Sequence, residues 1–266
     1  MANNILITGS TDGIGKLAAN SLAQQGHRLF VHGRNPEKVK RVVADIKTAA
    51  QNDQIHGLVA DLSDLDAVRQ MATTIQEELP VLDVLINNAG VYNSPISQTK
   101  EGLDIRFVVN YFAPFLLTQA LIPLLQKAAQ PRIINLSSAA QAPIDYQLLR
   151  GERTASANQA YAQSKLALTS WSFYLAKQHP DITTIALNPG SLLNTRMVQE
   201  AFGHHWAPAD KGANIIVDLA LSDAYQSKSG RYFDNDQGGF GHAHADADEP
   251  SEMDKLMRET KQLLRL

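Results

Sequence analysis

The sequence predicts an α/β fold in which a doubly wound, Rossmann-like parallel sheet of about seven strands carries helices on both faces. Two observations predict it. Short apolar runs alternate with longer helical patterns along the chain, and the runs are continuous, as in strands buried on both faces. Helices between consecutive strands imply right-handed βαβ units, and these build a parallel sheet.

The expected elements follow from these runs in chain order. Strands are expected at Asn4–Thr8, Arg28–His32, Ile55–Ala60, Leu82–Asn87, Arg132–Leu136, Thr183–Asn188 and Arg231–Phe233. Helices are expected at about 13–25, 37–50, 64–79, 102–128, 158–178 and 250–264, with short helices before 222. The segment 238–248 is rich in Gly, His, Ala and Asp and predicts an irregular loop. Nothing divides the chain, so a single domain over residues 1–266 is expected.

The composition excludes several classes of function. A net charge of -3 argues against binding nucleic acid, which needs a basic surface. The chain has no cysteine, so thiolate catalysis and disulfides are excluded. Adjacent His204 and His205 have no third ligand at a suitable spacing, and no metal site is expected. The longest apolar stretch, 112–125, is too short to span a membrane. We expect a cytoplasmic protein.

A glycine-rich segment, TGSTDGIG at residues 8–15, follows the first strand and leads into a helix. Glycines let the chain turn sharply and bring backbone N–H groups close to a pyrophosphate, and the helix N-terminus adds a favourable dipole. An ordinary flexible turn is the competing interpretation. The position directly after the first strand of the chain favours a dinucleotide site.

The ends of the second and third strands indicate which dinucleotide binds. NAD-binding sheets usually carry an acidic residue after the second strand, for the ribose 2′-OH. This chain has Gly33 and Arg34 there, and an arginine can pair with a 2′-phosphate. NADP(H) is therefore favoured over NAD(H), although a solvated surface arginine is the alternative. Asp61 and Leu62 close the third strand and are expected at the adenine.

Four polar residues are candidates for catalysis: Asn110, Ser138, Tyr161 and Lys165. Tyr161 and Lys165 are four residues apart on a predicted helix, which places them on one face. Reduction of a carbonyl by hydride creates an alkoxide that must be protonated. A tyrosine can supply that proton if a nearby ammonium brings its pKa down from about 10.

The other two candidates complete the arrangement. Ser138 ends the fifth strand, where it can hydrogen-bond the substrate oxygen, with Ser137 as the fallback. Asn110 can hold a water that links the lysine to solvent. A Tyr–Lys pair alone is often surface packing. Here the pair occurs with a glycine loop and strand-end polar residues, at the sheet edge where ligands bind.

With these motifs the sequence resembles the short-chain dehydrogenase/reductase family, from Ile5 to about Phe233. The matching segments are TGSTDGIG (8–15), NNAG (87–90), VVNYF around Asn110, IINLSS (133–138), YAQSK (161–165) and NPGSLLNT (188–195). The resemblance implies a nicotinamide cofactor and an Asn-Ser-Tyr-Lys tetrad. It also implies homodimers or homotetramers, commonly joined through the two long helices that carry Asn110 and Tyr161.

The resemblance also assigns cofactor contacts. Matching positions are Gly9, Ser10, Gly13, Ile14 and Gly15 at the pyrophosphate, Asn88, Ala89 and Gly90 at the adenosine ribose, and Pro189, Gly190 and Thr195 beside the nicotinamide, with Tyr161 and Lys165 at its ribose. Two segments depart from the family pattern. The gap from Ser138 to Tyr161 is longer than usual, as in the retinol-dehydrogenase-like and WW-domain-oxidoreductase-like branch, and its insertion, 144–158, is expected at the substrate mouth. The loop from Gly190 to Thr195 is one residue longer than the common pattern.

The expected function is hydride transfer between NADP(H) and a carbonyl or alcohol group of a small hydrophobic substrate. Apolar residues near 140–157 and in a substrate loop near 190–210, such as Leu148, Leu193, Met197 and Trp206, suggest the hydrophobic substrate. One alternative is an NADP-binding regulator without turnover, which the filled tetrad disfavours. Another is a C=C reductase using the same tetrad, whose close relatives use a cysteine that is absent here. Nucleotide-sugar epimerases are longer and space their glycines differently.

Overall fold

Eight strands form one sheet in the order β3-β2-β1-β4-β5-β6-β7-β8. They are β1 (Asn4–Ile7), β2 (Arg28–Gly33), β3 (Ile55–Val59), β4 (Val84–Asn87), β5 (Arg132–Leu136), β6 (Thr183–Asn188), β7 (Arg231–Asp234) and β8 (Gly239–Gly241). The first seven are parallel, and β8 pairs antiparallel with β7. The computed structural model describes residues 2–266, apart from the side chain of Phe202.

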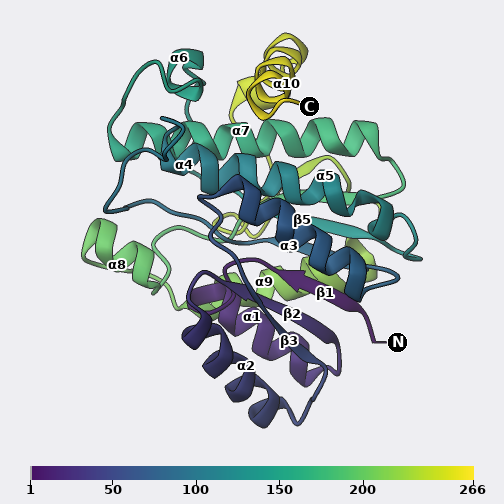
Figure 1. Cartoon of the computed structure of the whole chain (residues 1–266). Coiled ribbons are helices and arrows are strands. Elements are labelled where there is room, and N and C mark those ends of the chain that lie inside the picture. Colours follow the sequence, from purple (N-terminus) through teal and green to yellow (C-terminus); the bar gives the residue numbers. More distant parts are fainter. Residues whose placement is uncertain (1) are drawn as a thin grey trace.

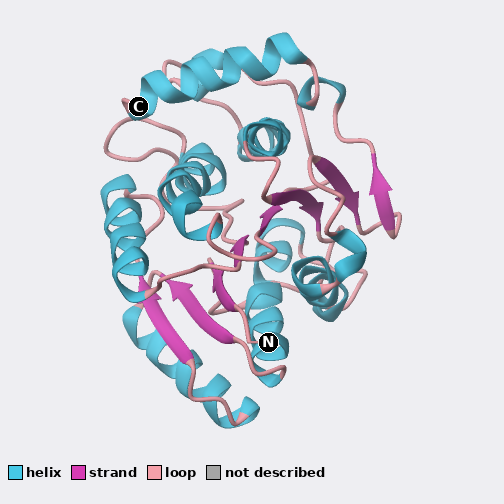
Figure 2. Ribbon diagram, turned by 90° about the vertical axis from the view of Figure 1, so that its right-hand side faces the viewer, coloured by secondary structure: helices cyan, strands magenta, loops and turns pink. Residues whose placement is uncertain are grey.

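Helices cover both faces of the sheet (Figures 1 and 2). One face carries α1 (Gly13–Gln24), α2 (Pro36–Ala50) and α9 (Ala209–Leu221), and the other carries α3 (Leu65–Glu78), α5 (Ala113–Leu125) and α7 (Ala157–Gln178). Shorter helices are α4 (Ile105–Phe107), α6 (Tyr146–Leu149) and α8 (Arg196–Phe202), and α10 (Pro250–Leu264) ends the chain. The predicted doubly wound sheet is confirmed.

The two cores follow from the alternation of side chains along each strand. Ile5 and Ile7 pack under α1 and α9, whereas Leu6, between them, packs with the α5 and α7 layer. All three are fully buried. Side chains two residues apart share a face of a strand, so a continuous apolar run supplies both layers at once.

One expectation about secondary structure was wrong. The segment expected as an irregular loop contains β8, because its main chain completes a ladder with Tyr232 to Asp234 of β7. The long helix expected at about 102–128 is confirmed as one continuous helix, Ile105–Leu125, made of α4, a π-helical segment η1 (Val108–Phe112) and α5. Pro114 lacks the N–H that would bond the carbonyl of Asn110 in an α-helix, which favours a π turn here.

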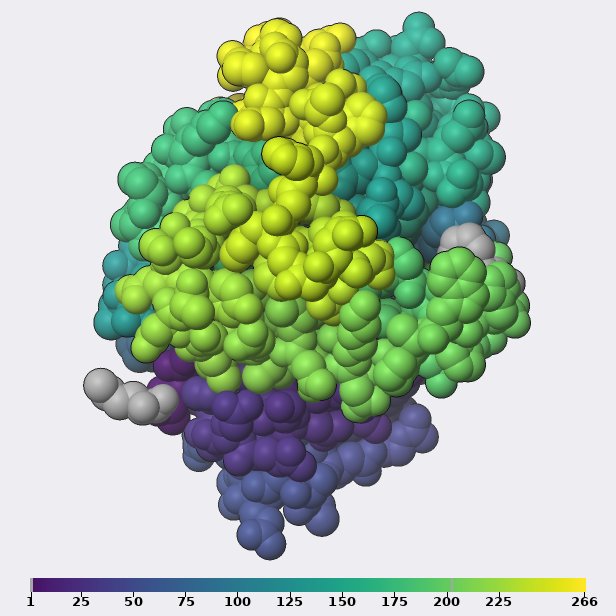
Figure 3. All heavy atoms as spheres, turned by 180° about the vertical axis from the view of Figure 1, so that it is seen from behind, coloured from purple at the N-terminus to yellow at the C-terminus, as the bar shows by residue number. Residues whose placement is uncertain are grey.

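The C-terminal helix α10 lies across α7 (Figures 1 and 3). Leu256 and Met257 of α10 are buried in the core, and Thr260 bonds the hydroxyl of Tyr111 at 2.7 Å. Residues 164–173 of α7 are all buried within one chain. Of the helix pair through which the resemblance implied dimerisation, α7 and the π segment at Tyr111 are thus packed against the chain's own C-terminal helix.

The insertion at 144–158 does not lie at the mouth of the site, in contrast to expectation. Leu148 and Leu149 of α6 are buried in the main core, and the hydroxyl of Tyr146 donates to the carboxylate of Glu252 on α10 at 3.1 Å. Apolar side chains of the insertion are therefore explained by packing under α10. They give no information about the substrate.

The continuous helix Ile105–Leu125 is, by length and composition alone, apolar enough to cross a membrane. Its most apolar window is 78% buried inside the fold. Within this helix α5 packs against α3, and α4 and the π segment pack against α7. That burial is what a core helix shows, and the composition of this helix needs no lipid to explain it.

Candidate active site

A cleft of about 560 Å³ opens at the carboxyl ends of the strands. The strand order reverses between β1 and β4, so the loops after these two strands diverge and leave a crevice. Its lining runs from the glycine loop, through the ends of β2, β3 and β4, to Ser138 and Tyr161. One continuous cleft thus connects the predicted dinucleotide loop with the predicted catalytic pair.

The glycine loop has the shape that close backbone approach requires. Gly9 has φ +64°, and a Cβ there would lie 2.7 Å from the Cα of Ala89. At Gly15 a Cβ would collide with the side-chain amide of Asn88. Helix α1 begins at Gly13 and is capped by Asp12, so its first-turn N–H groups face the cleft without helical partners. This cradle suits an anionic phosphate group.

Two side chains hold the glycine loop in place. The amide of Asn88 donates to the carbonyls of Thr8 and Gly9, at 2.8 and 3.0 Å. His32 accepts from the N–H of Gly9 at 3.0 Å and, with its other ring nitrogen, contacts the carbonyl of Ala60 at 3.1 Å. Burial lowers the pKa of His32 to about 4, which keeps the ring neutral. His32 was not predicted from the sequence, because a histidine within an apolar strand carries no motif.

The ends of β2 and β3 form the adenosine end of the cleft. Arg34 is exposed and lines the cleft beside Gly33 and Thr11. A Cβ at Gly33 would lie 2.6 Å from the side chain of Thr11, so no larger residue fits without movement. Asp61 and Leu62 line the same end. Thr11 was not among the predicted contacts.

The structure does not support the predicted cofactor contact of Ser10. Ser10 does not line the cleft, because its hydroxyl donates to the carbonyl of Ile7 at 2.8 Å and accepts from the N–H of His32. Its own N–H bonds the carbonyl of His32 at 2.9 Å. Both donors of Ser10 are therefore engaged inside the protein, where they support the loop.

Tyr161 and Ser138 meet at the far end of the cleft. Burial raises the pKa of the Tyr161 phenol, and the neighbouring side chain of Ser138 lowers it by a smaller amount. We expected a lowered pKa from Lys165, and that expectation was wrong for this structure. A raised pKa keeps the phenol protonated at neutral pH, which is the form that can donate a proton.

Lys165 lies behind this pair. Its Nζ donates to the carbonyl of Leu136 at 2.6 Å and lies 5.6 Å from the centre of the Tyr161 ring. Burial lowers the pKa of Lys165 to about 7, because an ammonium is poorly solvated away from water. A Cβ at Gly90 would lie 3.5 Å from both Nζ of Lys165 and Oδ1 of Asn110. Glycine at position 90 therefore leaves room between these two groups.

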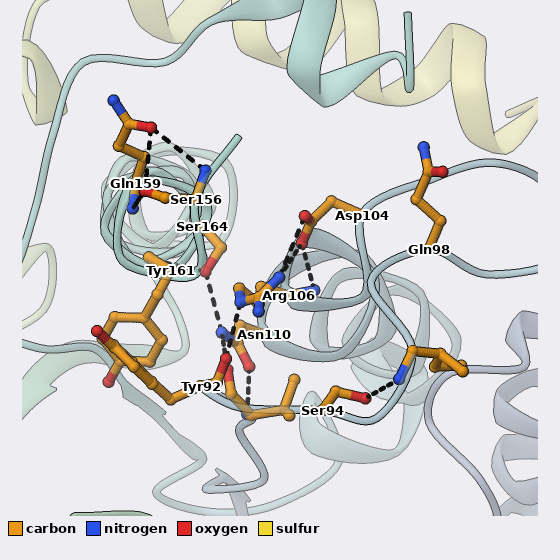
Figure 4. A network of polar contacts seen from close by, with 12 residues as sticks. Tyr92, Ser94, Gln98, Asp104, Arg106, Asn110, Ser156, Gln159, Tyr161 and Ser164 are labelled. Atoms are coloured by element: carbon orange, nitrogen blue, oxygen red, sulfur yellow. Dashed lines mark hydrogen bonds and ion pairs between the residues drawn. The ribbon is translucent and has the colours of Figure 1, made fainter. Parts of the chain in front are cut away.

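Asn110 lies in the π-helical segment, away from the cleft wall. Its amide donates to the carbonyl of Val91 and to the hydroxyl of Ser164, at 3.1 and 3.0 Å, and its oxygen accepts from the N–H of Val91 at 2.8 Å. Ser164 in turn donates to the carbonyl of Tyr161. Figure 4 shows this connection between the loop after β4 and the helix of Tyr161.

The structure separates the two adjacent serines. Ser137 is buried and its hydroxyl bonds Thr169 of α7 at 2.6 Å. Ser138 is partly exposed, lines the cleft beside Tyr161 and accepts from the N–H of Ala140 at 3.1 Å. The geometry favours Ser138 and leaves the fallback, Ser137, in a packing role.

Helix α8 and the loop before it close the cleft on its remaining side. Pro189, Gly190 and Thr195 line it. Thr195 caps α8, and its methyl group would lie 3.6 Å from a Cβ at Gly13, directly across the glycine loop. Leu193 and Met197 also line the cleft, whereas Trp206 is 77% exposed and does not.

The comparison with known families agrees with this arrangement. A profile of the short chain dehydrogenase family matches residues 3–206. The chain belongs to this family. Among solved structures, a short-chain dehydrogenase from Escherichia coli CFT073 complexed with NADPH is 28% identical, with a TM-score of 0.72 over 88% of this chain and 96% of that one. A protein from Mycobacterium paratuberculosis has a TM-score of 0.80 at 25% identity, over 99% and 93% of the two chains.

Curated relatives bear out the expected retinol-dehydrogenase-like branch. Human retinol dehydrogenase 11 is 34% identical over 86% of this short-chain dehydrogenase and 76% of its own length. Human polyprenol dehydrogenase is 32% identical over 87% and 76% of the two chains. A Shigella flexneri short-chain dehydrogenase complexed with NADP is 29% identical, with a TM-score of 0.70 over 88% and 97%.

Proposed function

We propose that this short-chain dehydrogenase transfers a hydride between NADP(H) and a carbonyl or alcohol group of a small apolar substrate. One observation carries the proposal: Tyr161 and Ser138 are neighbours in a cleft that the glycine loop also lines. A cleft that extends from the glycine loop to Tyr161 would hold a dinucleotide with its reactive end beside a proton donor.

Several features support NADP(H). The backbone at Gly9 and Gly15 packs so closely against Ala89 and Asn88 that no side chain fits there, as the tight turn of a pyrophosphate-binding loop requires. Arg34 lines the adenosine end, and no carboxylate follows β2 to favour a free 2′-OH. The family members from Escherichia coli and Shigella flexneri were solved with NADPH and NADP. Arg34 is the residue of this chain that would pair with a 2′-phosphate.

When bound, the nicotinamide supplies or accepts the hydride. Ser138 would hold the substrate oxygen, and Tyr161, protonated at neutral pH, would donate its phenolic proton to that oxygen as the C–H bond forms. Lys165 lies within reach of the ring of Tyr161 and can compensate the charge left on the phenolate. Asn110 fixes the helix of Tyr161 through Ser164 and the loop after β4 through Val91.

The substrate class follows from the wall of the cleft. Ile96, Val109, Leu193 and Met197 line the same cleft as Tyr161, so apolar groups would be desolvated there. The relatives named retinol dehydrogenase and polyprenol dehydrogenase support the same class. A cytoplasmic location remains a prediction from sequence. An oligomer also remains a prediction, and it would need a surface other than the covered face of α7.

Tyr161→Phe tests the proposal. It removes the proton donor and leaves the ring, so kcat should fall by roughly 10²–10⁴-fold, while the NADPH dissociation constant stays within about twofold. Turnover is measured as NADPH oxidation over a panel of aldehydes and ketones. Retained turnover in the variant would refute the role of Tyr161. A wild-type chain that binds NADPH but reduces nothing on the panel would instead favour the regulatory alternative.

A further inference from the structure

A buried ion pair lies beside the candidate site without belonging to its tetrad. Asp104 and Arg106 pair at 3.3 Å, and only 7% of each side chain is exposed. Taking two charges out of water is costly, and a buried pair adds little stability over an apolar pair of the same volume. A pair of this kind is better explained by a conformation that it fixes than by stability.

The conformation that it fixes is the loop after β4. Nε of Arg106 donates to the carbonyl of Tyr92 at 2.8 Å, and Asp104 accepts from the backbone and guanidinium of Arg106. One turn later, Asn110 bonds both backbone groups of Val91. Two consecutive residues of the loop are therefore attached to the start of the α4–α5 helix, as Figure 4 shows.

The side chain of Tyr92 reaches the reacting end of the cleft. Its ring centre lies 5.0 Å from that of Tyr161, with the ring planes tilted by 59°, and it lines the cleft together with Ser138. Tilted rings at this separation attract each other. A substrate whose carbonyl reaches Tyr161 and Ser138 would have its carbon skeleton against the ring of Tyr92, which Figure 4 shows next to Tyr161.

We propose that Tyr92 is a specificity-determining residue for the substrate, and that Arg106, supported by Asp104, is the positioning residue that holds Tyr92 against Tyr161. The ligand class is a carbonyl compound with a flat or apolar group within a few bonds of the carbonyl, which packs on the aromatic face. The substrate half of this inference rests on the proposed function, whereas the positioning half rests on the geometry alone.

The positioning half is tested without turnover. The protein is labelled with fluorotyrosine, and the ¹⁹F signal of Tyr161 is identified as the one that Tyr161→Phe removes. Tyr92→Leu and Arg106→Met should both shift this signal, because the neighbouring ring is lost or displaced, and Tyr92→Phe should restore it. Arg69→Met, which breaks the exposed pair with Asp66 on α3, is the matched control and should not shift it.

An unshifted Tyr161 signal in folded Arg106→Met would overturn the positioning role. If the single variant does not fold because Asp104 is left unpaired, the double variant Asp104→Asn/Arg106→Met is used. It keeps a capping side chain for the N–H of residue 106 and leaves no buried charge. An unshifted Tyr161 signal in the folded double variant would likewise overturn the positioning role.

The substrate half is tested with propanal and 3-phenylpropanal. Tyr92→Leu should lower the ratio of kcat/KM for the phenyl compound over propanal by about tenfold, a typical effect of one pocket contact. Tyr92→Phe should keep the ratio within about twofold of the wild type. An unchanged ratio in Tyr92→Leu would overturn the specificity role. If the wild type reduces no carbonyl compound, the proposed function and the specificity role both fail, and the ¹⁹F shift alone decides the positioning role.

Discussion

Lys165→Met should change how stability depends on pH. Burial lowers the pKa of Lys165 to about 7 in the folded chain, against 10.5 when the side chain is in water. Between these values the unfolded chain binds a proton that the folded chain does not, so the free energy of unfolding rises with pH. From pH 7 to 9 this one group contributes a rise of about 2 kcal/mol. The variant should lose that rise.

The assay is urea unfolding of the nucleotide-free protein at pH 7, 8 and 9. The range ends at pH 9 because tyrosines of the unfolded chain ionise near 10. Lys177→Met, an exposed lysine on the same helix with 56% of its side chain exposed, is the control and should keep the wild-type slope. Parallel curves for the wild type and Lys165→Met would refute the reasoning, since they would show that burial does not depress the pKa of Lys165.

Two further predictions concern the cofactor end of the cleft. Arg34→Ala should raise the NADPH dissociation constant by about 10- to 100-fold, because one charge-assisted contact is lost. The NADH dissociation constant should be nearly unchanged, and both constants are measured by nucleotide fluorescence titration. Equal effects on both constants would contradict a 2′-phosphate contact. His32→Leu removes the acceptor for the N–H of Gly9 and should weaken NADPH binding by about tenfold. His32→Asn keeps an acceptor and should retain most of the NADPH affinity. If both variants instead have a lower melting temperature and an unchanged NADPH affinity, His32 has only a structural role.

Much of the fold was predictable because buried parallel strands need continuous apolar runs. The run around Leu29 to Val31, for example, supplies both faces of β2. Strand β8 was not predictable in the same way: Gly239 and Gly241 have little strand propensity, and their conformation comes from pairing with β7. The insertion was misplaced because an apolar residue such as Leu148 suits a core as well as a pocket.

The candidate site was predictable where backbone chemistry demands a residue type. Gly9 and Gly15 are required because their backbone lies close to Ala89 and Asn88. Tyr161 and Lys165 could be paired because residues four apart lie on the same face of a helix. Tyr92 and Arg106 were missed, because their roles depend on a loop path that no local pattern encodes. The direction of the Tyr161 pKa shift was also misjudged, because burial is a property of the folded chain and is its largest cause.

Transfer of deuterium from NADPH labelled at C4 of the nicotinamide tests the proposed reaction most directly. The labelled cofactor is incubated with the wild-type chain and an aldehyde or ketone that it reduces, and the product is analysed by mass spectrometry and NMR. Deuterium should appear on the former carbonyl carbon, from one face of the nicotinamide, and the transfer should be lost in Tyr161→Phe. Label on a carbon of a former C=C bond, or an alcohol product without label, would contradict carbonyl reduction at this site.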